Sequence, residues 1–124
     1  MNKLYVITPL ELAEKGLNLS DYAYDETFIP AIINKGLSLT ISRACKLGDL
    51  KSSQQLERYI SEDDSDRTSE EKVVAFKEAQ YRMLYNLIFM NETTPDNDYV
   101  DNCLVYELGM KINGFQKGLY YRHN

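Results

Sequence analysis

The chain has 124 residues, a formal net charge of −5 and 44% hydrophobic residues, which is typical of one globular domain whose core is large enough to fold alone. No apolar run approaches the roughly 18 residues that a membrane helix needs, and the run at residues 4–7 is too short for a signal peptide. We therefore expect a protein that folds in a cytosol, with Cys45 and Cys103 reduced and packed as small hydrophobic residues.

The first helix is predicted over residues 9–15 because its start carries two independent signals. Thr8 and Glu11 have the spacing of a capping box, and Pro9 occupies the first helical position, where no N–H donor is needed. Gly16 is the kind of residue that commonly closes a helix.

A second, longer helix is predicted to start near residues 25–28, where Asp25 or Thr27 can cap it, and to end at Gly48. Its apolar positions recur at helical spacing over about four turns, which indicates one buried stripe. The stripe consists of Ile29, Ile32, Ile33, Gly36, Leu37, Thr40, Ile41 and Ala44. Gly36 on this stripe predicts a close approach by another helix.

Two further helices are predicted on either side of a polar connector. The shorter one spans residues 52–61. Its expected inward-facing residues are Leu56, Tyr59 and Ile60. The longer one spans residues 69–91 and begins with a second capping box, from Thr68 to Glu71. Its predicted apolar face consists of Val73, Val74, Phe76, Lys77, Gln80, Tyr81, Leu84, Leu87 and Ile88, bordered by Met83 and Met90.

A last helix is predicted after the pair Thr94-Pro95, which repeats the arrangement of a cap followed by proline. Its apolar positions, three and four residues apart, are Val100, Cys103, Leu104, Leu108, Ile112 and Phe115. Only residues 4–7 also suit a strand. The predicted fold is all-α, with a single domain of four to five helices over residues 1–114 and an extended C-terminal tail over residues 115–124.

Residue types that support catalysis or metal binding are scarce in this chain. The single histidine, His123, is next to the last residue, which is a poor place to hold a nucleophilic site rigidly. Two distant cysteines do not form a zinc site, and the acidic run from Glu62 to Asp66 lacks the glycine and glutamate spacing of a calcium loop. We therefore predict no enzyme activity, no cofactor and no metal, with an unrecognised carboxylate site as an alternative.

Sequence-specific DNA binding is a further alternative. Residues 8–20 have the look of the first helix and turn of a helix-turn-helix motif. The residues that follow, however, include Asp21, Asp25 and Glu26, whose charge would repel phosphates. The pattern therefore does not favour DNA reading.

Charge is distributed unevenly along the chain. Residues 57–71 carry seven acidic and two basic residues, and residues 92–107 carry five acidic residues and no base. The end of the chain is basic and rich in large apolar side chains, through Lys111, Phe115, Lys117, Leu119, Tyr120, Tyr121 and Arg122. Such residues are unusual in a disordered end and common at interface hot spots. The tail is thus predicted either to fold back onto the domain or to dock onto a partner.

The order of these features resembles the head–tail connector (adaptor) proteins of tailed bacteriophages. A short capped helix, an acidic turn and a long helix with paired aliphatic residues come first, and a long aromatic helix, another helix and a projecting tail follow. The matching positions in the first half are Leu10, Ala13, Leu17, Leu19, Asp21, Asp25, Ile29, Ile32, Ile33 and Ile41. In the second half, the segment VVAFKEAQYRMLYNLIFM corresponds to the long aromatic helix.

The resemblance implies a structural protein of the virion neck, made in the host cytoplasm. It implies a homo-oligomeric ring, commonly a dodecamer, that binds the portal protein and a tail or neck completion protein. DNA would pass through the ring without sequence recognition, and no membrane would be involved. The other reading that the sequence leaves open is a small cytosolic helical regulator or adaptor that binds one protein partner.

Within the connector reading, two groups of residues are candidate sites. Acidic residues would let DNA slide through a channel by repelling it, although an outer or inter-subunit position suits them equally. The channel-facing candidates are Asp63, Asp64, Asp66, Glu70 and Glu71. The candidates for docking on a neighbour or on the portal are Phe115, Lys117, Leu119, Tyr120, Tyr121 and Arg122.

Overall fold

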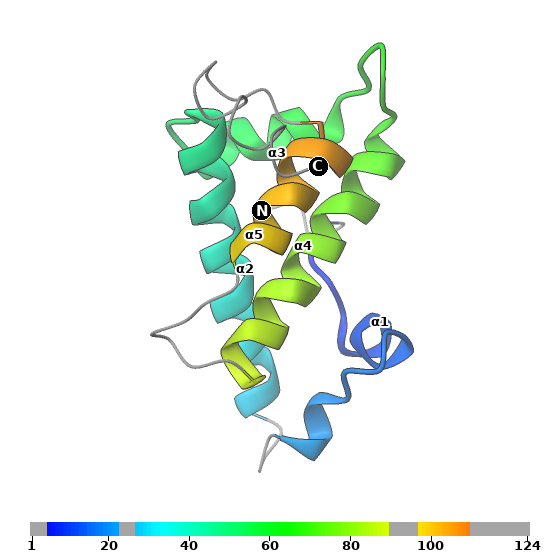
Figure 1. Ribbon diagram of the computed structural model, residues 1–124, viewed down its shortest axis with the longest axis vertical. Coiled ribbons are helices and arrows are strands. Elements are labelled where there is room, and N and C mark those ends of the chain that lie inside the picture. Colours follow the sequence, from blue (N-terminus) through cyan, green and yellow to red (C-terminus); the bar gives the residue numbers. More distant parts are fainter. Residues whose placement is uncertain (1–4, 23–26, 90–96, 110–124) are drawn as a thin grey trace.

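The computed structural model describes residues 5–22, 27–89 and 97–109, and the regular elements within these ranges are all helical (Figure 1). In chain order they are α1 (Pro9–Glu14), the 3₁₀ turn η2 (Leu19–Asp21), α2 (Phe28–Gly48), α3 (Ser53–Ser61), α4 (Ser69–Phe89), α5 (Asn97–Asn102) and the π-helical turn η3 (Cys103–Glu107). The prediction of a single all-α domain is confirmed. The predicted tail at residues 115–124 lies outside the described residues.

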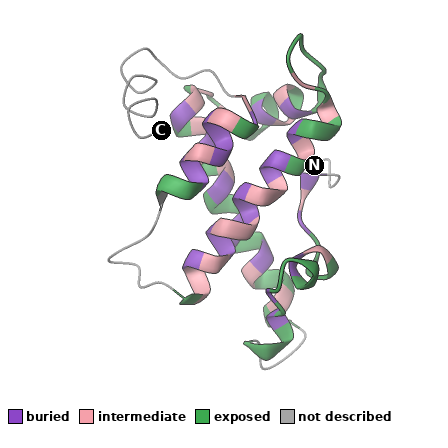
Figure 2. Ribbon diagram, turned by 45° about the vertical axis from the view of Figure 1, so that its right-hand side comes forward, coloured by how far each residue is buried: buried purple, intermediate pink, exposed green. Residues whose placement is uncertain are grey.

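The two long helices, α2 and α4, run antiparallel, and α5 with η3 lies against both of them (Figure 1). The short helix α3 crosses one end of this arrangement, beside the start of α4. Arg43 of α2 fastens α5 in place, because its Nε and Nη2 each donate to a carboxylate oxygen of the buried Asp101 at 2.6 Å. Buried residues follow the facing sides of these helices, as Figure 2 shows.

The predicted close approach at Gly36 is confirmed. A Cβ atom at this position would lie 2.7 Å from Cδ2 of Leu84, which is fully buried on α4. Because real Cβ atoms do not approach a neighbour that closely, any side chain at this position would force Leu84 or the helix crossing to shift. The helix propensity lost at Gly36 is offset by this packing.

The buried face of α4 differs from the predicted one at several positions, because Lys72, Ala75, Ala79 and Asn86 are buried although they were not assigned to it. Val74 is 68% exposed, so its assignment to the core was wrong, whereas Lys72 is 1% exposed. The core positions follow the helical period through Phe76, Gln80 and Leu84. Val74 lies two residues before Phe76 and therefore points to nearly the opposite side of the helix.

The N-terminal segment before α1 is held by a side chain rather than by a strand partner. Tyr5 and Ile7 are 2% and 1% exposed, and Gln80 of α4 lies beside them. Its Nε2 donates to the Tyr5 carbonyl oxygen at 2.5 Å, and its Oε1 accepts from the Ile7 N–H at 3.1 Å. The buried amide of Gln80 thus satisfies backbone groups that a strand would pair within a sheet.

Both predicted capping boxes are present. The Thr8 hydroxyl accepts from the Glu11 N–H at 3.2 Å while the Glu11 carboxylate accepts from the Thr8 N–H, and Thr68 and Glu71 repeat the arrangement. At the end of α2, the left-handed conformation falls on Asp49, with φ of 53°, and not on the glycine before it.

The last predicted helix is regular only over α5. Its backbone then widens into the π-helical turn η3 before it reaches Gly109, whose φ is +79°. The predicted inward positions of this segment that the structure describes are all buried, namely Val100, Cys103, Leu104 and Leu108. Ile112 and Phe115 lie outside the described residues.

Candidate functional site

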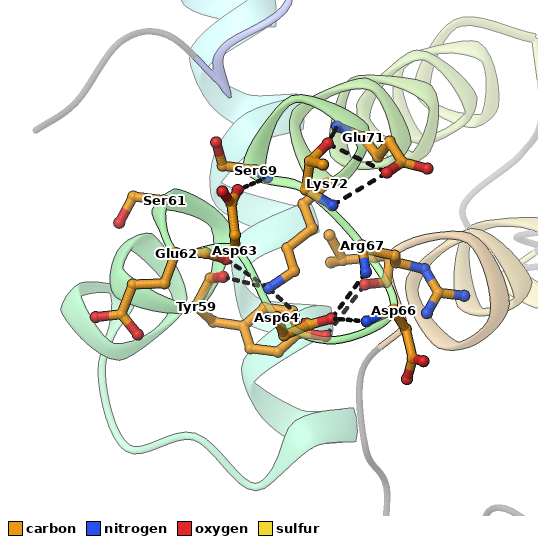
Figure 3. A network of polar contacts seen from close by, with 12 residues as sticks. Tyr59, Ser61, Glu62, Asp63, Asp64, Asp66, Arg67, Ser69, Glu71 and Lys72 are labelled. Carbon is orange, nitrogen blue, oxygen red and sulfur yellow. Dashed lines mark hydrogen bonds and ion pairs between the residues drawn. The ribbon is translucent and has the colours of Figure 1, made fainter.

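A buried lysine organises the loop between α3 and α4 (Figure 3). The Nζ of Lys72 donates to the carbonyl oxygens of Tyr59 at 3.0 Å and Glu62 at 2.8 Å, and it forms an ion pair with Asp64 at 2.8 Å. The same ammonium group lies 4.2 Å from the centre of the Tyr59 ring. Because a lysine is rarely buried without partners, this set of contacts explains why α4 tolerates a charge on its inner face.

Two of the predicted acidic residues shape the same loop. Asp64 accepts from the N–H groups of Asp66 and Arg67 at 2.8 Å each, and the bond from Lys72 together with these two lowers the pKa of its carboxyl group. Asp63 accepts from the Ser69 N–H at 2.5 Å, where the first turn of α4 has no backbone acceptor of its own. Both carboxylates therefore act on local backbone conformation.

Arg67 joins this loop to the π-helical turn η3. Its Nε donates to the Glu107 carbonyl oxygen at 2.8 Å, and its Nη2 donates to the Tyr106 carbonyl oxygen. A Cβ atom at Gly109 would collide with the same guanidinium group. Nearby, the Tyr59 hydroxyl donates to the Leu108 carbonyl oxygen at 3.1 Å. These bonds satisfy carbonyl groups that the end of a helix leaves open.

The five predicted channel-facing residues share one exposed region at the start of α4. Asp63, Asp64 and Glu71 are engaged in the local hydrogen bonds given above, whereas the carboxylates of Asp66 and Glu70 make no hydrogen bond or ion pair with another described residue. Whether these side chains face a channel stays a prediction.

A shallow groove of about 420 Å³ lies beside this loop, between the first turns of α4 and the end of η3. It is lined by Glu70, Glu71, Val74, Ala75 and Glu107. The exposed Val74 is its apolar centre, and the three glutamates make its border acidic. This combination suits a ligand that is both apolar and basic.

The other half of α4 carries a row of aromatic rings. Tyr81, Tyr85 and Phe89 are four residues apart along one side of the helix, and Tyr22 of the segment after η2 extends the row. Ring centres lie 6.4 Å apart for Tyr81 and Tyr85, 4.7 Å for Tyr85 and Phe89, and 5.1 Å for Phe89 and Tyr22. Phe89 is 47% exposed and Tyr22 44% exposed, so much of this apolar surface faces solvent.

Arg82 connects the aromatic row to α5. Its guanidinium carbon lies 4.8 Å from the ring centre of Tyr85 and 4.7 Å from that of Tyr99, which places it between the two rings. The Tyr99 hydroxyl donates to Glu78 at 3.2 Å, and burial followed by this carboxylate raises the pKa of Tyr99. Lys15, directly after α1, pairs with Glu78 as well, so the exposed rings are held in a defined arrangement.

Sequence reasoning missed the row as a site, although it is visible in the sequence. Tyr81 was assigned to the core face, and Tyr85 and Phe89 were not singled out. Their spacing of four residues is the signal that would have found them. The contributions of Tyr22 and Tyr99 are not visible in that spacing, because they come from other segments. The predicted docking residues of the tail lie outside the described residues.

The two thiols are poorly suited to nucleophilic chemistry. Burial, together with Glu107 and Glu78, raises the pKa of Cys103 to about 12, and burial raises the pKa of Cys45. Both are free thiols that stay protonated near neutral pH, and the thiolate is the reactive form.

Two findings concern the described part of the chain as a whole, and comparisons with known proteins add a third. Within residues 5–22, 27–89 and 97–109, no group of three or more histidine, cysteine or acidic side chains is placed to hold a metal ion. In the same part of the chain, no helix combines the length and apolar character that crossing a membrane requires. No protein-family model, curated protein or solved structure matches the chain.

Proposed function

We propose that this protein is a structural head–tail connector of a tailed phage, whose copies form a ring beneath the portal and join head to tail. The aromatic row on α4 is the observation that carries the proposal. Tyrosine and arginine are the residues most enriched where protein interfaces gain their binding energy. The sequence resemblance supplies the connector identity, and the row supplies a surface on which such a protein can bind another.

The row is arranged as a contact surface needs to be. Arg82 between Tyr85 and Tyr99 limits the freedom of all three side chains before any partner arrives. These side chains therefore lose less conformational entropy when a partner binds. Phe89 and Tyr22 are half-exposed, so the fold leaves apolar area that association would bury.

The loop at the start of α4 suits a ring protein in a different way. Lys72 of α4 donates to carbonyl groups at the end of α3 and the start of the loop, and Arg67 joins the loop to η3. The acidic residues of the loop therefore lie on a defined backbone. A rigid acidic loop repeated around a ring would present a regular negative surface. Such a surface would keep DNA from adhering to the ring.

The direct test mixes the full-length protein with the portal ring encoded in the same genome, followed by light scattering and electron microscopy. We expect a complex in which many copies bind one portal ring. The double variant Tyr22→Ser/Phe89→Ser should bind the ring at least about tenfold more weakly, since it removes two exposed anchors. Leu10→Ser is the matched control, because Leu10 is 70% exposed on α1 and lies outside the row.

The tail offers a second test of the same proposal. A chain without residues 115–124 should keep its helical circular dichroism spectrum and lose its binding to the portal ring. A protein that stays monomeric or dimeric with every virion component, and binds one cytosolic protein instead, would support the alternative of a small regulator. Turnover of a small substrate by the purified protein would contradict both.

A further inference from the structure

We infer that the groove lined by Glu70, Glu71, Val74, Ala75 and Glu107 receives the C-terminal segment, residues 110–124, of a second copy of this chain. This inference rests on the proposed function only in that copies of the chain associate. It names the surface that each copy offers to the tail of its neighbour, which the sequence left open.

The groove has an apolar centre that the fold does not use. Val74 is 68% exposed although it lies in the first half of a long, well-packed helix. Beside it, Ala75 is only 4% exposed and forms a flat floor without a projecting side chain. An aromatic or aliphatic side chain laid across Val74 and Ala75 would bury surface that now contacts water.

The border of the groove is entirely acidic. Glu70 and Glu71 lie on the first turn of α4, and Glu107 faces them from the end of η3. Glu71 is already committed to the capping box with Thr68, while Glu70 makes no ion pair with any other described residue. Basic groups in the occupant would offset this concentration of negative charge.

The C-terminal segment has the complementary chemistry. Residues 110–124 contain Lys111, Lys117, Arg122 and no acidic residue. Their large apolar side chains are Phe115, Leu119, Tyr120 and Tyr121, interspersed with the bases. Helix α2 also carries three bases and no acidic residue, but its apolar stripe is already buried in the core, so the C-terminal segment is the part of the chain that best matches the groove in charge and apolar character.

The length of the segment is compatible with a neighbouring copy as its source. Gly109 is two residues beyond Glu107, which lines the groove, and it lines a separate hollow beside Arg67. The first aromatic anchor, Phe115, comes six residues later, which is about 20 Å of extended chain. A segment of that length is long enough to reach a neighbouring subunit, as head-to-tail contacts around a ring require.

A charge exchange between two full-length variants tests the contact. The groove variant is Glu70→Lys/Glu107→Lys, which leaves the Thr68–Glu71 capping box intact. The tail variant is Lys117→Glu/Arg122→Glu. Each variant alone should self-associate at least about tenfold more weakly than the wild type in sedimentation velocity, because like charges now face each other. An equimolar mixture should recover association, since each groove again meets a tail of opposite charge.

The mixture separates a contact between copies from one within a copy. If the segment docks in its own groove, mixing restores nothing, and only the chain that carries all four substitutions behaves like the wild type. That outcome, or unchanged association of both variants, overturns the inference. Glu14→Lys/Asp21→Lys is a control of equal charge change, because both residues are exposed and neither lines the groove, and it should leave association unaltered.

Disulfide trapping gives an answer even where self-association is too weak for sedimentation. A tagged Val74→Cys chain and an untagged Leu119→Cys chain are mixed and oxidised, with the wild-type chain as the control for Cys45 and Cys103. We expect a covalent heterodimer in excess over the homodimers. Its absence overturns the inference. Since both experiments use this chain alone, they can succeed when portal binding fails, and the two proposals are therefore judged separately.

Discussion

The two halves of α4 are joined to the rest of the protein by different means. The first half is fastened by polar groups, with Lys72 buried among carbonyl oxygens and Asp64 holding the loop. The second half is fastened by close apolar packing, where Gly36 of α2 admits Leu84. Outside that packing, the second half leaves aromatic rings in solvent, whereas the first half leaves carboxylates and a single valine.

This difference separates residues whose role is explained by the fold from residues whose role is not. Asp63, Asp64 and Glu71 satisfy backbone donors at the start of α4, so their presence needs no partner to account for it. Phe89 and Val74 are large apolar groups that remain exposed, and the fold gains little from them. The exposed apolar groups, more than the acidic loop, are therefore the features that indicate association.

The largest effect is expected from adding a side chain where α2 and α4 cross. Gly36→Val should lower the free energy of unfolding by about 3 kcal/mol, because the new side chain would overlap Leu84. Denaturant titration measures it, and Ser38→Val on the exposed side of α2 should stay within about 0.5 kcal/mol. Adding Leu84→Ala to Gly36→Val should cost less than Leu84→Ala costs in the wild type. Independent, additive effects would mean that the two residues do not meet.

A smaller loss is expected from the polar half. Lys72→Met keeps an unbranched apolar stem and removes the ammonium donor from two carbonyl oxygens, which should cost about 2 kcal/mol. Lys77→Met is the matched control on the same helix, since Lys77 pairs with the partly exposed Glu11 and should cost less than about 1 kcal/mol. Equal losses for the two variants would refute a special role for Lys72.

The ion pair at Asp64 predicts a pH dependence. Its pKa is lowered in the folded protein by Lys72 and by two backbone N–H groups, so its stabilising effect is complete above the ordinary aspartate pKa of 3.8 and is lost as the pH falls toward the lowered value. Asp64→Asn should therefore be less stable than the wild type at neutral pH, and the gap should narrow below about pH 4. Urea titrations across this range measure the gap.

Asp66→Asn removes the same charge from the same loop and serves as the control for Asp64→Asn. It should show no comparable gap at neutral pH, because the Asp66 carboxylate forms no ion pair with another described residue. A gap for Asp64→Asn that stays constant through the acidic range would contradict the assigned ion pair.

The smallest effect on stability is expected from the aromatic row. Phe89→Ser should reduce the free energy of unfolding by only about 1 kcal/mol, because the ring is half-exposed and loses two aromatic contacts. Thermal unfolding followed by circular dichroism measures this loss. Combined with a strong loss of portal binding, it would sharpen the contrast between a surface for association and a core. A loss as large as that of Gly36→Val would make Phe89 a core residue instead.

Local signals in the sequence were sufficient for most helix positions. Thr8, Thr68 and the residues that follow them define helix starts through contacts within one turn, so the order of residues is enough to recognise them. Gly36 could be interpreted as well, since a glycine on an apolar helical stripe lets another helix approach closely. The start of α2 at Phe28 and its end at Gly48 agree with the predicted bounds, although the Thr27 side chain makes no capping hydrogen bond and the left-handed residue at the end is Asp49.

The candidate site was less accessible to such reasoning. Val74 was assigned to the apolar face of its helix, and Lys72 was not. Lys72 is buried because its ammonium group donates to the carbonyl oxygens of Tyr59 and Glu62. These acceptors lie outside α4, so the sequence of α4 does not reveal them. The pairing of Arg82 with Tyr99 likewise depends on where α5 packs.

The sequence by itself determined the helical class, the capping boxes and the uneven charge, because each depends on residues within a few positions of one another. Only the tertiary structure decided which α4 residues face water, how Gln80 binds the N-terminal segment and which carbonyl groups of η3 accept hydrogen bonds from Arg67. These depend on groups in different segments of the chain, whose meeting is set by the packing of whole helices and by no local pattern.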